Sequence, residues 1–232
     1  MEIFLLLGAF FKAMLFVLAA ILPIINPLAM APTFLSLTEG ASKQTRAALA
    51  KRIGLNTLGL LSGAMLLGSH VLDFFGVSLP VVRVAGGMIV AKTAWNLLNS
   101  RPQDKNDREH MAEAFTAEEA RRQAFYPMTF PISCGPGSMA ASITVGAALV
   151  DPQWSVFTAR LGGALAANFL IGLTVYLVYR HARRLLGPLG ETGMVVFLRL
   201  SAFILLCVGV QIVWDGVSEM LRGLIHDLPP AA

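Results

Sequence analysis

Long apolar runs, each able to cross a lipid bilayer, dominate this chain. A membrane-spanning helix needs about 20 predominantly apolar residues, and from Ile3 to Thr38 the only charged side chain is Lys12. Only 14% of the 232 residues are charged, against about 25% in an average soluble domain. The pattern predicts an all-α integral membrane protein with six transmembrane helices, lying within residues 3–38, 53–72, 79–98, 124–150, 156–179 and 195–217.

The basic residues gather in the connections on one side of these spans. Cytoplasmic loops of membrane proteins carry an excess of Lys and Arg, so the connections that contain them are predicted to be cytoplasmic and both termini to lie outside, in the periplasm of a bacterial inner membrane. We therefore interpret the net charge of +4 as a determinant of topology; the expected surroundings are lipid, with no nucleic acid. The residues are Lys43, Arg46, Lys51, Arg52, Arg101, Lys105, Arg108, Arg121, Arg122, Arg180, Arg183 and Arg184.

The first and fourth spans are both interrupted by prolines. Sliding the second half of the chain by 109 positions places Asn26-Pro27-Leu28-Ala29-Met30-Ala31 on Gly135-Pro136-Gly137-Ser138-Met139-Ala140. A rival offset of 104 superposes Pro23, Pro27 and Pro32 on Pro127, Pro131 and Pro136. We prefer 109, because it places a proline at the start of each second half-helix and matches the Met-Ala that follows.

The two halves contain three spans each, and an odd number of spans inserts the halves with opposite orientation. The predicted organisation is therefore an inverted repeat with residues 1–98 and 124–232 as its two three-helix units, joined by a charged cytoplasmic connection at 99–123. Transporters built from inverted repeats bind their substrates near the bilayer midplane, between broken helices. The predicted breaks are thus also the predicted site.

The stretch TFPISCGPGSMA (129–140) shows how such a break could bind a ligand. If a helix restarts at Pro136, the first amides of that helix point back toward the break and form an anion site. Carbonyls that end the preceding half-helix, around 130–133, would face an ammonium group or a cation. The predicted substrate-binding residues are Asn26, Pro27, Ser133, Cys134, Gly135, Gly137, Ser138 and Met139.

Each of these residues also has a purely structural interpretation. Proline kinks can serve packing alone, and Cys134 can be a small filler residue. Asn56 and Asn168 lie inside the second and fifth spans; they either line the site or form hydrogen bonds between helices. No Asp or Glu lies in the middle of a span, which disfavours proton coupling through a carboxylate. Coupling to a cation such as Na⁺ through carbonyls and transport without a coupling ion both stay open.

Enzymatic chemistry and bound cofactors have little support in the sequence. The chain contains neither an HExxH nor a GxSxG motif, and neither Cys134 nor Cys207 has metal-ligand spacing to a histidine. We therefore expect no metal site, no cofactor and no enzymatic activity.

The segments ILPIINPLAMAPTFLSLTEG (21–40) and TFPISCGPGSMAASITVGA (129–147) resemble the two signature segments of the MarC family, also called the neutral amino acid transporter (NAAT) family. The resemblance extends over essentially the whole chain. It implies six spans in an inverted repeat related to the LysE superfamily. It also implies uptake or exchange of small neutral amino acids such as glycine and alanine, linked in some members to Na⁺ or H⁺.

The function hypothesis from the sequence is a secondary transporter that binds a small zwitterionic amino acid between the two breaks and operates by alternating access. Two alternatives stay open: an exporter of another small solute on the same scaffold, and a non-transporting membrane scaffold protein. The direction of transport and the oligomeric state stay open as well.

Overall fold

The computed structural model describes residues 2–38, 40–99 and 124–226, and within these ranges all regular elements are helical. The predicted charged connection at 99–123 lies, apart from Asn99, outside the described residues. The elements are α1 (Glu2–Ile25), α2 (Pro27–Leu37), α3 (Lys43–Phe74), α4 (Leu79–Asn99), η1 (Ala124–Ser133), α7 (Pro136–Ala148), α8 (Trp154–Arg180), α9 (Ala182–Leu186), η2 (Gly187–Leu189) and α10 (Gly190–His226).

Five helical stretches in the described part of the chain are long and apolar enough to cross a membrane. They are Glu2–Leu35, which joins α1 to most of α2, together with α3, α4, α8 and Thr192–Leu224 of α10. The region predicted as the fourth span is divided between η1 and α7, of 10 and 13 residues. Each of these two segments is shorter than the bilayer core requires of a single helix.

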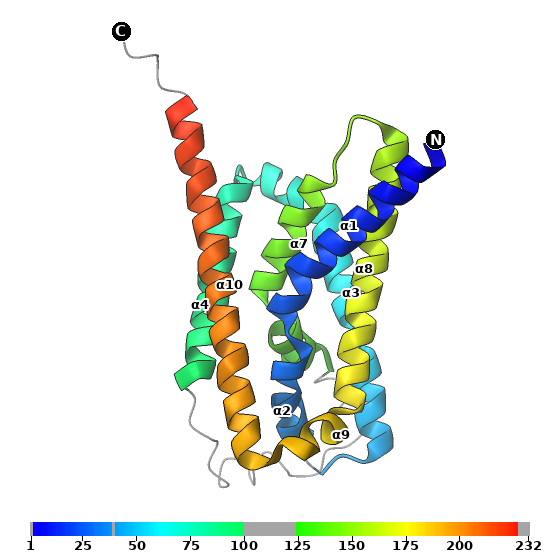
Figure 1. Cartoon of the computed structure of the whole chain (residues 1–232), viewed down its shortest axis with the longest axis vertical. Coiled ribbons are helices and arrows are strands. Elements are labelled where there is room, and N and C mark those ends of the chain that lie inside the picture. Colours follow the sequence, from blue (N-terminus) through cyan, green and yellow to red (C-terminus); the bar gives the residue numbers. More distant parts are fainter. Residues whose placement is uncertain (1, 39, 100–123, 227–232) are drawn as a thin grey trace.

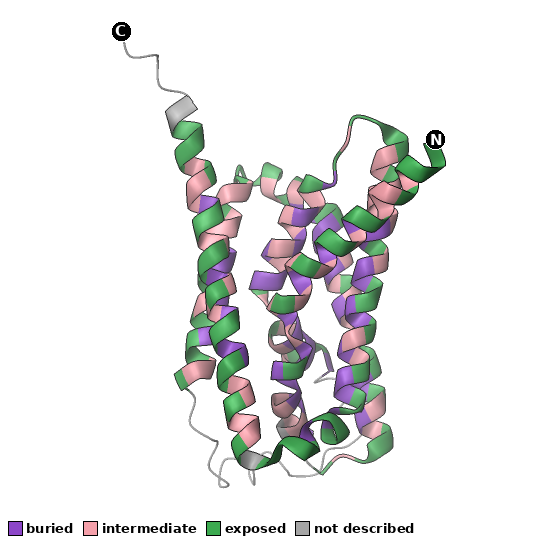
Figure 2. Ribbon diagram, in the orientation of Figure 1, coloured by how far each residue is buried: buried purple, intermediate pink, exposed green. Residues whose placement is uncertain are grey.

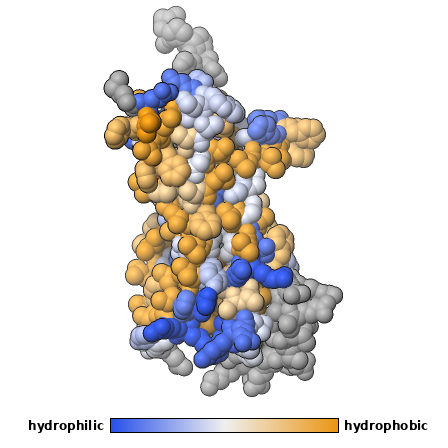
Figure 3. All heavy atoms as spheres, turned by 90° about the vertical axis from the view of Figure 1, so that its right-hand side faces the viewer, coloured by the Kyte–Doolittle hydropathy of each residue, from blue (hydrophilic) through white to orange (hydrophobic). Residues whose placement is uncertain are grey.

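The apolar surface of the molecule faces outward, as a lipid environment requires. Large side chains such as Phe4 and Phe74 are 81% and 84% exposed, and buried residues form stripes on the inner faces of the helices (Figure 2). On the face shown in Figure 3, apolar side chains cover most of the height, and polar ones gather mainly toward the ends. The all-helical membrane protein predicted from the sequence is confirmed.

The helices form one main bundle and one helix pair (Figure 1). A single apolar core joins residues of α1, α2, α3, η1, α7, α8 and α9. The pair α4–α10 lies at one edge, with a separate small core of Val90, Ala94 and Leu205, and it contacts the bundle mainly through α4 and α7. The start of α1 and the end of α10 lie at the same end of the molecule, and the α2–α3 turn and α9 lie at the opposite end.

The short helix α2 is closed at its C-terminal end by Arg46 of the following helix. This side chain is only 5% exposed. Its Nε donates to Thr38 Oγ1 at 3.1 Å, and its Nη2 donates to the carbonyl oxygens of Thr38 at 2.9 Å and Ala41 at 3.4 Å. Carbonyls at a helix C-terminus lack helical partners and favour a cation. Arg46, in the first turn of α3, is therefore a cap for α2 as well as one of the basic residues at this end of the molecule.

Glycines allow the closest helix contacts in the bundle. A Cβ atom added at Gly54 of α3 would lie 2.6 Å from the carbonyl oxygen of Gly172 of α8, and one added at Gly172 would lie 2.7 Å from the carbonyl oxygen of Gly54. Small residues at such crossings let two backbones approach, which is how helices commonly associate in membranes. The α3–α8 contact therefore depends on the absence of side chains at this pair.

Replacing Gly54 by alanine tests this dependence. Because the new methyl group would overlap backbone atoms of α8, we expect the free energy of unfolding to fall by about 1–3 kcal/mol. Gly59→Ala on the same helix is the matched control, since an added Cβ there has nothing within 4 Å. The midpoint of thermal unfolding in detergent should fall for Gly54→Ala and hold or rise for Gly59→Ala; equal shifts would contradict the close contact.

Candidate functional site

The first helix break lies at Asn26, between α1 and α2. Asn26 has a φ of 40°, a left-handed conformation that asparagine tolerates better than most residues. Its side-chain Oδ1 accepts a hydrogen bond from the amide of Ala29 at 3.3 Å, and Pro27 occupies the first position of α2. The predicted restart of a helix at Pro27 is confirmed, with Asn26 as its N-cap.

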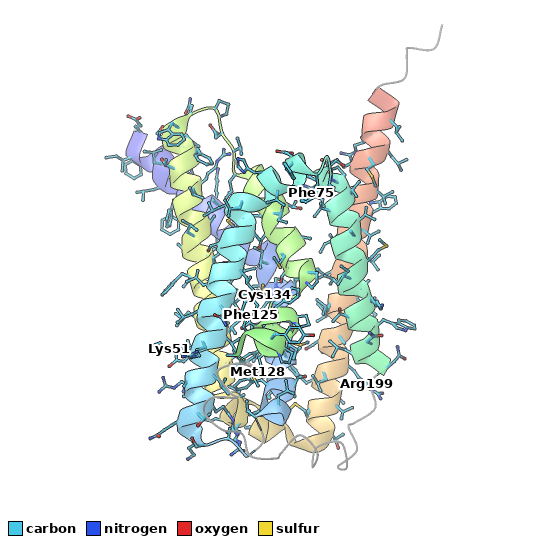
Figure 4. The ribbon with its side chains drawn as sticks, turned by 180° about the vertical axis from the view of Figure 1, so that it is seen from behind. Lys51, Phe75, Phe125, Met128, Cys134 and Arg199 are labelled. Carbon is cyan, nitrogen blue, oxygen red and sulfur yellow. The ribbon has the colours of Figure 1, made fainter. Side chains whose placement is uncertain are left out.

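The second break lies at Gly135, and α7 restarts at Pro136, as predicted. Gly135 has extended backbone angles (φ −85°, ψ 177°), and no side chain caps the helix that follows. The freedom of glycine at positive φ is therefore not used here; a Cβ atom at Gly135 would instead lie 3.0 Å from the carbonyl oxygen of Pro131. Figure 4 shows Cys134, which precedes this break, between the levels of Phe75 at one end and Lys51 and Arg199 toward the other.

The segment before the second break is not the regular half-helix that the sequence predicted. Within η1, Tyr126 (φ −121°, ψ 125°) and Phe130 (φ −110°, ψ 123°) have extended backbone. Both residues precede a proline, and a proline disfavours helical angles in the residue before it. The amide of Cys134 consequently bonds to the carbonyl of Thr129, five residues back, at 2.7 Å, and the chain forms a wide, irregular coil.

Tyr179 of α8 fastens this irregular segment to the bundle. Its hydroxyl lies 2.8 Å from Ser133 Oγ, which also donates to the carbonyl oxygen of Met128 at 2.7 Å. The tyrosine ring is stacked on Phe34 of α2, with ring centroids 4.6 Å apart. Tyr179 was not among the residues predicted from the sequence. Its one signal was a tyrosine inside an apolar span, because a buried tyrosine hydroxyl usually needs a partner.

The residues predicted around the second break lie together, but most of them are packed. Ser133, Cys134, Gly137 and Ser138 are buried, and Met139 is partly buried. Ser138 Oγ donates to the carbonyl oxygen of Gly135 at 2.8 Å and contacts Cys134 Sγ at 3.4 Å.

Gly137 faces the neighbouring helix α4. A Cβ atom added at this residue would lie 2.2 Å from Cγ2 of Val90, so the packing role of this glycine is established by the geometry. The packing of Gly137 does not occupy its amide, because the amides of the first turn of a helix have no partner within that helix.

The first break borders the same apolar core as the second. Ile25 and Ala29 on one side and Cys134 on the other belong to this core, whereas Asn26 is partly exposed and Pro27 is buried. Among the described residues, no hydrogen bond joins the two breaks directly. They are neighbours across one core and are not a single hydrogen-bonded site.

The two intramembrane asparagines connect helices. Asn56 Nδ2 donates to Thr129 Oγ1 at 3.2 Å, so it links α3 to the segment before the second break. Asn168 Nδ2 donates to Ser62 Oγ at 3.3 Å and links α8 to α3, while its buried Oδ1 has no partner. The interhelical alternative is thus observed for both, and Asn168 keeps a free acceptor in the interior.

Two cavities in the described part of the chain have no residue of the breaks in their linings. One, of about 650 Å³, lies between α1, α7 and the start of α8; the other, of about 450 Å³, lies along α10.

Ser133 and Tyr179 allow a direct test of what holds η1 in place. Ser133→Ala leaves the buried Tyr179 hydroxyl without its partner, which costs about 1–3 kcal/mol. Tyr179→Phe removes the hydroxyl itself while Ser133 keeps its bond to Met128, so it should cost less. Thermal unfolding of both single variants and the double variant in detergent measures the coupling; equal losses with no coupling would contradict this bond.

The chain is similar in sequence to named membrane proteins. The chain is 28% identical over 214 residues to the "UPF0056 inner membrane protein MarC" of Escherichia coli (strain K12), covering 91% of this chain and 97% of that protein. It is 29% identical over 208 residues to the "UPF0056 membrane protein MJ1677" of Methanocaldococcus jannaschii, covering 89% and 97%. No solved structure matches the chain.

The match to a family description covers nearly the whole length of the protein. Residues 10–221 fit the description "MarC family integral membrane protein", and this range contains both helix breaks and all five of the apolar helical stretches in whole or in large part. The Escherichia coli relatives are named as inner membrane proteins, and this chain has several apolar helices long enough to span a membrane. Together these findings indicate an inner-membrane, multi-pass protein. The chain belongs to the MarC family of integral membrane proteins.

Proposed function

We propose that the protein is a secondary transporter of small neutral amino acids that binds its substrate at the two helix breaks. The observation that carries this proposal is the pair of breaks itself. Irregular backbone at membrane depth is tolerated only where protein buries it or where it lines a cavity, and here it occurs twice, at Asn26 and at 134–135. The resemblance to neutral amino acid transporters names the substrate class.

The architecture that goes with this proposal is six spans in an inverted repeat. Helices α2 and α7 start at Pro27 and Pro136, which are 109 positions apart and so favour that register over 104. If η1 and α7 together form the fourth span, the first and fourth spans are the two broken ones. The start of α1 and the end of α10 at the same end of the molecule (Figure 1) fit an even number of crossings.

The chemistry proposed for the substrate follows from the ends of the broken helices. The amides of Gly137, Ser138 and Met139 would bind its carboxylate, because an uncapped helix N-terminus attracts an anion. The Met139 amide already donates to the carbonyl oxygen of Gly135 at 3.2 Å. To bind the substrate, this amide would have to give up that bond. The substrate ammonium group would bind carbonyls near Asn26 or Ser133, with Na⁺ as a candidate coupling ion.

A non-transporting scaffold is the second candidate, and the packing of the second break favours it. Gly137 fits against Val90, and Ser133, Cys134 and Ser138 are buried. For a transporter, this packing represents an occluded conformation in which α4 and α10 would have to move relative to the bundle before a substrate enters. An exporter of another small solute would share the site and differ in direction and cargo.

Reconstitution into liposomes distinguishes these candidates. Proteoliposomes should accumulate labelled glycine or alanine with saturable kinetics, and the measurement is made with and without a Na⁺ gradient. Stimulation by the gradient would identify Na⁺ as the coupling ion. Absence of saturable flux for every small neutral amino acid, in both directions, would reject the proposed function and leave the exporter of another solute or the scaffold.

Charge placed at the start of α7 tests where the carboxylate binds. Pro136 is exposed and occupies the first helical position, where glutamate and glutamine are both tolerated. Pro136→Glu should lower flux about tenfold or more relative to Pro136→Gln, since only the charge differs and it would occupy or repel the anion site. Equal flux in the two variants would remove the anion site from the proposal; Gly137→Val is unsuitable, because it collides with Val90.

The proposed orientation places both termini in the periplasm. Alkaline phosphatase, which is active only after export, should be active when it is fused to the C-terminus and inactive when it is fused after residue 186, in the connection between α8 and α10. The reverse pattern would show that the basic end of the molecule faces outward.

A further inference from the structure

The larger cavity is apolar with two basic side chains. It lies between the first half of α1, the end of α7 and the start of α8. Phe4, Leu5, Phe16 and Leu149 contribute apolar walls, and Lys12 and Arg160 contribute the charges. Phe4, Leu5 and Phe16 are 81%, 68% and 50% exposed, so the cavity opens onto the apolar surface of α1.

The charges in this cavity do not balance within the described part of the chain. Arg160 Nη2 pairs with Asp151 Oδ2 at 3.0 Å. Lys12 is exposed and forms no ion pair with a described acidic residue. Lys12 thus adds a positive charge that no described ion pair balances beside the apolar walls, and the cavity has the electrostatics of a site for one anion.

We propose that this cavity binds the headgroup of an anionic phospholipid, with the phosphate between Lys12 and Arg160 and an acyl chain along Phe4, Leu5 and Phe16. A lysine and an arginine beside apolar walls suit a phosphate headgroup by charge and by hydrogen bonding, and an opening on the apolar surface of α1 gives the bilayer direct access. A zwitterionic amino acid fits less well, because its ammonium group would lie beside Lys12. The proposal does not depend on the transport function, since none of the break residues lines the cavity.

Arg160 can serve both partners at once. A guanidinium has five N–H donors, and the pair with Asp151 is made through Nη2, which leaves donors for a phosphate oxygen. Asp151 itself also accepts from the amide of Gln153 at 2.9 Å, so the turn between α7 and α8 holds Arg160 in position. Lys12 supplies the charge that this turn does not neutralise.

Native mass spectrometry of the delipidated full-length protein tests the proposal. The protein is titrated with phosphatidylglycerol and, separately, with phosphatidylcholine that has the same acyl chains. We expect one phosphatidylglycerol to bind more tightly than phosphatidylcholine, and Lys12→Gln to weaken its binding about fivefold, the effect of one lysine near an anionic lipid surface. The matched control is Lys92→Gln, an exposed lysine on α4, which should bind as the wild type does.

Two further measurements make the outcome decisive. Lys12→Arg keeps the positive charge and should bind phosphatidylglycerol as the wild type does. If Lys12→Gln elutes poorly in gel filtration, this second variant shows whether the lost binding reflects the missing charge or a misfolded protein. Excess glycine should leave the bound phosphatidylglycerol in place. Equal binding of the two lipids, unchanged binding in Lys12→Gln, or displacement by glycine would each overturn the proposal, the last by assigning the cavity to the transported solute.

Discussion

Inside a bilayer every backbone N–H and C=O group must find its partner within the protein, because lipid tails offer none. Continuous helices such as α3 and α8 meet this condition by themselves. The two breaks interrupt it, and the protein restores it differently at each one. At Asn26 a side-chain oxygen of the break residue caps the next helix; at Gly135 no side chain does so, and the segment before the break bonds back over five residues instead.

The two breaks therefore differ in which parts of the protein support them. The first break is completed by residues next to it in the sequence, whereas the second is held by side chains from other helices. Asn56 of α3 donates a hydrogen bond to Thr129 of η1, and the hydroxyl of Tyr179 of α8 is hydrogen-bonded to Ser133 of η1. Val90 of α4 fills the space beside Gly137. A movement of α4 or α8 would therefore act directly on the second break, which makes it the more responsive of the two under the transport proposal.

The extent of each apolar run predicted most of the helices, because the bilayer sets the length of a spanning helix. The restarts at Pro27 and Pro136 were also predictable, since proline is favoured at the first position of a helix. The shape of η1 was not predicted. Pro127 and Pro131 each act on the aromatic residue directly before them, and their combined effect depends on tertiary support. Contacts such as Tyr179 with Ser133 join positions 46 residues apart, and no local pattern in one sequence reports them.

The two caps of α2 have a consequence for how the protein is made. Asn26, Thr38 and Arg46, which complete both ends of this 11-residue helix, lie within a single stretch of 21 residues. These capping bonds can therefore form while the ribosome is still synthesising α3. The first broken span can thus enter the bilayer with both ends of α2 capped, whereas the Ser133 partner in η1, Tyr179, is synthesised later. The order of synthesis therefore makes the capped first break available before the partners of the second.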